Sequence, residues 1–172
     1  QNILVLETDI IDRPPIAGAH VDLGVVSADG GPFRKLARTT AFNFPQGARQ
    51  QWIHDSQTFT YNCLVGDSWG TTLMDLSGDV LNLYESAIYA TSPIADEAIC
   101  LNFARLHRLG GYGYVGLEDK HASDGASGKD GLVRLDLKSG KSELLVSLAD
   151  IASLGGTGDG HLGRHYVTHV VY

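Results

Sequence analysis

The chain has 172 residues, of which 43% are hydrophobic and 19% are charged. This is enough for one domain of about 100–200 residues and too little for two ordinary ones. Thirteen Lys and Arg residues against twenty Asp and Glu residues give a formal charge of −7, which excludes the uniform basic field that holds nucleic-acid backbones. No apolar run approaches the roughly 18–20 residues that span a bilayer. We therefore expect neither a nucleic-acid partner nor a membrane segment.

The start of the chain and its cysteines bear on the cellular compartment. Residues 1–11 lack the basic start and the small-residue cleavage site of a signal peptide. A chain that begins with Gln1 instead of Met is compatible with removal of an export signal. Cys63 and Cys100 lack the close pairing of a zinc or redox motif. We expect both to be buried thiols.

Short β-rich runs separated by many glycines follow one another along the chain. In order, the clearest runs are 2–8, 59–65, 71–76, 132–137 and 165–172. Helical periodicity is limited to two short segments. These are 102–109 (NFARLHRL) and 147–154 (SLADIASL). The pattern predicts an all-β protein with two short helices.

One hairpin recurs three times, at 23–36, 71–85 and 131–148. Each copy has an apolar strand, a turn that contains glycine, and a second strand with apolar residues on alternate positions. The turn glycines are Gly30, Gly78 and Gly140. Glycine there supplies the positive φ that tight hairpins require.

Asp75 and Asp136 occupy a repeated position just before two of these turns. Short polar side chains at such positions usually accept hydrogen bonds from turn N–H groups. We therefore interpret both carboxylates as structural.

Further hairpins at 50–65 and 87–103 precede the second and third copies. The resulting order of strands is that of a four-stranded propeller blade. We predict a β-propeller with about three blades of four antiparallel strands. Its parts are a partial blade at 1–45, a blade at 46–86, a blade at 87–154 and the first strand of a further blade at 165–172.

Residues 104–129 form an insertion between the second and third strands of the 87–154 blade and have no counterpart in the preceding blade. In a propeller such insertions emerge on one face, where ligands often bind. A closed propeller uses roughly 4–8 blades, so blades are missing from this chain. They would come either from a longer protein or from other copies of the chain.

Five stretches carry a resemblance to a known group of proteins. They are 39–52 (TTAFNFPQGARQQW), 59–62 (FTYN), 88–93 (IYATSP), 101–114 (LNFARLHRLGGYGY) and 130–148 (DGLVRLDLKSGKSELLVSL). Together they resemble bacterial secreted β-propeller proteins related to the TolB-like and WD40-like repeat proteins, and 101–114 is the most specific. The nearest characterised relatives of that group are polysaccharide lyases of the oligogalacturonate-lyase and ulvan-lyase kind, which use seven-bladed propellers. The resemblance implies an extracytoplasmic protein, periplasmic or secreted, and an acidic polysaccharide or oligosaccharide as partner. Members of the group continue with further blades where this chain ends, at Tyr172.

Cleavage beside a uronic acid by β-elimination needs a cation for the carboxylate, a base for the α-proton and an acid for the leaving oxygen. The insertion offers suitable side chains within ten residues of one another. These are the catalytic candidates Arg105, His107, Arg108 and Tyr112, with Tyr114 as a substrate-binding residue. The alternative interpretation is structural. In that case the two tyrosines cap the core and the arginines pair with Glu118 and Asp119.

A second cluster lies near the end of the chain. It comprises His161, Arg164, His165 and His169. If 165–172 is a strand, His165 and His169 point to one face because side chains alternate with a period of two. The pair would then move protons or bind a divalent metal such as Mn, Ca or Zn, with Arg164 as a substrate-binding residue. The alternative is a structural pair that hydrogen-bonds to neighbouring blades.

Two functions follow from these observations. The first is a polysaccharide lyase, in which Arg105 or Arg108 holds the carboxylate and His165 or His169 moves protons with Tyr112. The second is a non-catalytic TolB- or WD40-like platform for binding or assembly, which would lack a converging set of His, Tyr and Arg side chains. A third hypothesis is that exposed edge strands pair with other copies of the chain.

Overall fold

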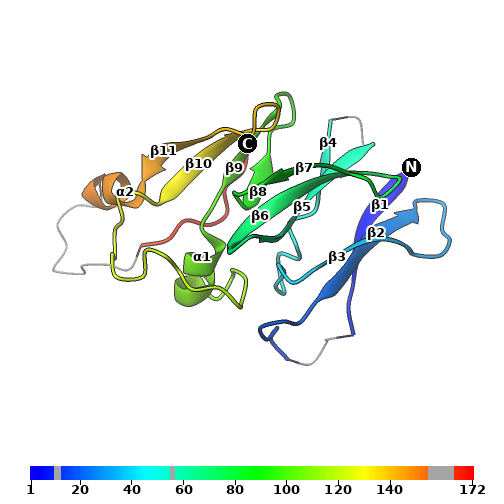
Figure 1. Ribbon diagram of the computed structural model, residues 1–172, viewed down its shortest axis with the longest axis horizontal. Helices are drawn as coiled ribbons and strands as arrows, with labels where there is room; N and C mark the ends of the chain where they lie inside the picture. Colours follow the sequence, from blue (N-terminus) through cyan, green and yellow to red (C-terminus); the bar gives the residue numbers. More distant parts are fainter. Residues whose placement is uncertain (10–12, 55–56, 155–164) are drawn as a thin grey trace.

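Three antiparallel sheets follow one another along the chain in the computed structural model, which describes residues 1–9, 13–54, 57–154 and 165–172 (Figure 1). The first sheet contains β1 (Asn2–Glu7), β2 (Val21–Ser27) and β3 (Arg34–Thr39). The second contains β4 (Gln51–Ile53), β5 (Thr58–Val65), β6 (Ser68–Asp75) and β7 (Val80–Tyr84). The third contains β8 (Ile88–Thr91), β9 (Glu97–Cys100), β10 (Gly131–Asp136) and β11 (Ser142–Ser147). In each sheet the strands lie in chain order, so the expected β-rich fold of consecutive meanders is confirmed.

The recurring hairpins form as their turn chemistry predicts. Gly30, Gly78 and Gly140 adopt φ values of 91°, 95° and 71°, which favour glycine over residues with a Cβ. The Asp75 carboxylate accepts hydrogen bonds from the N–H groups of Ser77 and Asp79. The Asp136 carboxylate accepts equivalent bonds from two turn N–H groups, those of Lys138 and Ser139. The structural interpretation of both aspartates is therefore confirmed.

Successive sheets pack against each other through buried apolar side chains. Val21 and Leu23 of β2 share a core cluster with Phe59 of β5, which joins the first sheet to the second. Tyr84 at the end of β7 shares another cluster with Leu135 of β10, which joins the second sheet to the third. The last strands of the second and third sheets, β7 and β11, are mostly exposed, whereas only half of the residues of β3 are exposed. Burial thus concentrates between the sheets, away from these outer strands.

The insertion leaves the third sheet between β9 and β10 and begins with helix α1 (Phe103–Gly110). The side chain of Asn102 accepts a hydrogen bond from the Arg105 N–H and caps the start of the helix. Gly111, with φ 73°, ends it. A second helix, α2 (Leu148–Leu154), follows β11. Both short helices lie where the sequence predicts them.

The prediction of a strand at 165–172 is wrong, because this segment carries no strand in the structure. Val167 and Val170 pack against the core, three positions apart and not two. His169 has φ 58°, which is incompatible with an extended strand. The segment is held to β8 through Tyr89, whose hydroxyl accepts a hydrogen bond from the His169 N–H at 2.9 Å. It lies between the third sheet and α1 (Figure 1).

Asn62, in the middle of β5, is fully buried and uses all of its side-chain hydrogen-bonding groups. Its Nδ2 donates to the Ile88 carbonyl at 2.8 Å and to the Tyr114 hydroxyl at 2.9 Å. Its Oδ1 accepts from the Thr71 hydroxyl and from the Ile88 N–H. One side chain therefore joins the second sheet, the third sheet and the insertion.

The two cysteines are free thiols. Cys100 is buried as predicted, and burial raises the pKa of its thiol to about 12. Cys63 is only partly buried, and its sulfur lies 3.1 Å from the Thr72 hydroxyl. In the part of the chain that the structure describes, no helix is long and apolar enough to cross a membrane.

We predict that Asn62→Ala lowers the free energy of unfolding by about 2–4 kcal/mol, because it leaves several buried partners without a hydrogen bond. Asn82→Ala is the control, since the Asn82 side chain is exposed and accepts a hydrogen bond from the adjacent Leu83 N–H. That change should stay within about 0.5 kcal/mol of the parent. Urea unfolding measures both. Equal midpoints for the two variants would contradict the role given to Asn62.

Candidate functional site

Arg105 is the first predicted catalytic residue, and the structure places it in the interior. Arg105 is only 1% exposed. The Nε atom forms ion pairs with Asp130 at 2.9 Å and with Asp119 at 3.3 Å. A guanidinium buried between two carboxylates is compensated in charge and closed to substrate. The catalytic assignment of Arg105 is therefore wrong.

The two terminal nitrogens of Arg105 donate to four backbone carbonyls. Nη1 reaches Gly125 at 3.2 Å and His165 at 3.0 Å, and Nη2 reaches His121 at 2.8 Å and Asp124 at 2.6 Å. Three of these carbonyls belong to the insertion, and the fourth belongs to the segment 165–172. Arg105 therefore ties both segments to α1, and its planar fork of donors suits this task.

Asp119 joins the two arginines of the insertion. Arg108 bonds to its carboxylate at 2.7 Å, Asn102 donates to it at 3.0 Å, and so does the His121 N–H. Burial opposes ionisation, but these hydrogen bonds outweigh it and lower the pKa of Asp119. Arg108 keeps one third of its side chain exposed. The alternative interpretation of an arginine–Asp119 pair is thus correct, whereas the second partner is Asp130 and not Glu118.

Tyr114, the predicted substrate-binding residue, is completely buried. Its ring stacks on Phe103 with centroids 4.2 Å apart and meets Trp69 edge-on at 5.6 Å. Burial raises the pKa of its hydroxyl far above the ordinary value. A substrate has no access to this side chain, so the substrate-binding assignment is wrong and Tyr114 is a core residue.

Tyr112 and His169 are brought together from opposite ends of the predicted site. Their rings meet edge-on with centroids 6.3 Å apart, and Tyr112 is 40% exposed. His107 is also exposed, in the last turn of α1, and its side chain makes no hydrogen bond or ring contact within the described residues. Two of the predicted catalytic side chains, those of Tyr112 and His169, thus lie together on the surface.

The second predicted cluster does not form the arrangement that the sequence suggested. His165 is held through its backbone, since its N–H donates to the Gly125 carbonyl and its carbonyl accepts from Arg105. Without a strand, His165 and His169 lose the expected alternation. Among the described residues no group of three or more His, Cys, Asp and Glu side chains could hold a metal ion. Arg164 and His161 lie outside the described residues.

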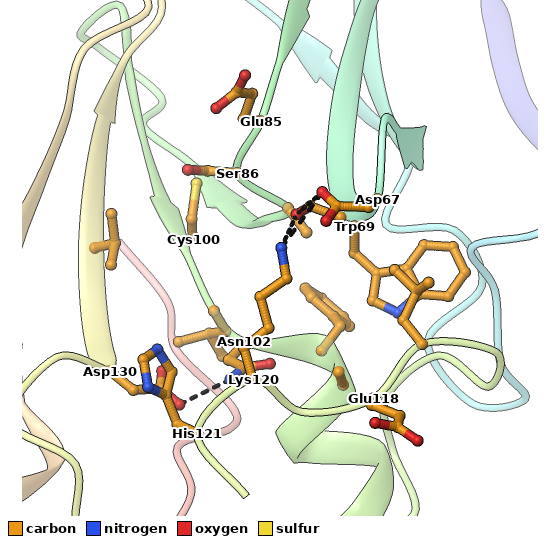
Figure 2. Close-up of a pocket in the computed structure, with 17 residues that line it drawn as sticks. Asp67, Trp69, Glu85, Ser86, Cys100, Asn102, Glu118, Lys120, His121 and Asp130 are labelled. Carbon is orange, nitrogen blue, oxygen red and sulfur yellow. Dashed lines mark hydrogen bonds and ion pairs between the residues drawn. The ribbon is translucent and has the colours of Figure 1, made fainter.

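A cleft that the sequence did not predict opens between the second and third sheets, beside the insertion. It encloses about 290 Å³, close to the lower end of the roughly 300–1,000 Å³ of small-molecule sites. Figure 2 shows side chains that converge on it from both sheets and from the insertion. The polar lining consists of Asp67, Ser68, Glu85, Ser86, Asn102, Glu118, Lys120, His121 and Asp130. The apolar lining includes Trp69, Ala87, Leu101, Phe103, Leu117 and Val133.

The charges in the cleft are mostly negative. Lys120 reaches across it to the Ser68 hydroxyl at 2.9 Å and to Asp67 at 3.4 Å (Figure 2). Glu85 and Glu118 are exposed, and neither has an ion pair or hydrogen bond among the described residues. The cleft therefore combines apolar walls, hydroxyl and amide groups, and two unpaired carboxylates.

Part of this lining was within reach of sequence analysis. Glu118, Lys120 and His121 belong to the insertion that the repeat comparison singled out. Glu85 and Ser86 lie in the connection between β7 and β8, where no sequence signal distinguishes them.

We predict that Arg105→Met lowers the free energy of unfolding by about 3–5 kcal/mol, because Asp130 remains buried without its cation and Asp119 keeps only Arg108. Arg134→Met is the control, since Arg134 forms an exposed pair with Glu143 at 2.6 Å. It should cost at most about 1 kcal/mol. Denaturant unfolding compares the two variants. A loss for Arg105→Met no larger than that for Arg134→Met would contradict the role of Arg105.

The lowered pKa of Asp119 predicts a loss of stability in acid. The ionised carboxylate stabilises the fold at pH values above its ordinary pKa of 3.8, and this contribution disappears as the pH falls through the lower, folded-state pKa. The stability gap between the parent and Asp119→Asn should therefore narrow from pH 6 to pH 3. Urea unfolding at several pH values measures it. A gap that is constant or grows toward acid would contradict the prediction.

A scan against protein-family models and a search of the curated proteins each returned no match.

Proposed function

We propose that the three sheets are consecutive blades of a β-propeller. Three features support this: the sheets are meanders in chain order, they pack on one another through buried side chains, and the outer strands of the second and third sheets, β7 and β11, are mostly exposed. β4 and β8, the first strands of the second and third sheets, contact each other. This is expected if they are the inner strands of adjacent blades. Further blades, from more chain or from other copies, would complete such a propeller.

We propose that the protein is a non-catalytic binding platform whose ligand is a saccharide held in the cleft. The observation that carries this proposal is the cleft itself, which lies between two successive sheets on the side where the insertion emerges. Its hydroxyl, amide and carboxylate groups pair well with sugar hydroxyls, and its apolar wall suits a sugar ring. The saccharide class and an extracytoplasmic location come from the resemblance described above.

The chemistry of the insertion favours binding over catalysis. A lyase of uronic-acid polysaccharides needs a cation free to hold the substrate carboxylate. The Arg105 guanidinium already binds two carboxylates and four backbone carbonyls, and Arg108 is paired with Asp119. Among the described residues, the ionisable cleft side chains without a partner are those of Glu85, Glu118 and His121, and the two carboxylates repel a uronate.

A polysaccharide lyase is the second candidate, and one observation favours it. Tyr112 and His169 lie ring to ring on the surface, and a tyrosine and a histidine are suited to proton transfer in β-elimination. In this version the partly exposed Arg108 would hold the substrate carboxylate.

We predict that oligosaccharides bind in the cleft and are not cleaved. Ser86→Trp places a large ring in the cleft and should abolish binding, whereas Ser77→Trp, in the exposed turn between β6 and β7, should leave binding unchanged. Isothermal titration calorimetry against neutral, acidic and amino oligosaccharides measures binding.

The ultraviolet absorbance of unsaturated uronate, measured with ulvan and pectin fragments, separates the two candidates. The binding platform predicts no signal. A signal that Tyr112→Phe removes would establish the lyase instead. Absence of binding to every oligosaccharide, or equal binding by both tryptophan variants, would refute the proposed platform.

A further inference from the structure

We draw no further inference here: the strongest candidate, the open edge of β1 in the first sheet, which has three strands where the second and third sheets have four, carries nothing because no contact among the described residues shows what covers that edge.

Discussion

A single buried arginine organises the part of the molecule where ligand binding is proposed. Arg105 is enclosed by the carboxylates of Asp119 and Asp130 and by four backbone carbonyls. A buried charge is tolerated only when it is paired and hydrogen-bonded, so the insertion and the segment 165–172 must fold around it. The cleft depends on this arrangement because Asp130 and four residues of the insertion line it, namely Leu117, Glu118, Lys120 and His121. Arg105 is therefore a positioning residue for the proposed site.

Hairpin structure was readable from the sequence because it depends on local chemistry. Positive-φ glycines such as Gly78 and turn-capping carboxylates such as Asp75 act within four or five residues, so their effect needs no knowledge of the fold. The insertion could be predicted because the 87–154 blade is longer than the preceding blade, and the excess falls at 104–129. Helix α1 was predicted from its helical pattern alone, and the structure adds the Asn102 cap at its start.

The roles of individual side chains were not readable, because they depend on partners far along the chain. Arg105 and Tyr114 resemble exposed functional residues in sequence, yet they are buried by Asp130 and Asn62, which lie 25 or more residues away. The segment 165–172 alternates like a strand but meets Tyr89 in an irregular conformation. The cleft arises between two sheets, so no single stretch of sequence describes it.

Native-state hydrogen exchange is the most direct measurement of the central claim that Arg105 makes the insertion part of the folded core. The informative amides are those of Ala122, Leu148 and His165, which donate to the Asp119, Asp130 and Gly125 carbonyls. The account predicts that these amides exchange as slowly as the Asn62 amide in β5, through a shared cooperative opening. Exchange of all three at the rate of the exposed turn 28–31, with Asn62 still protected, would contradict it.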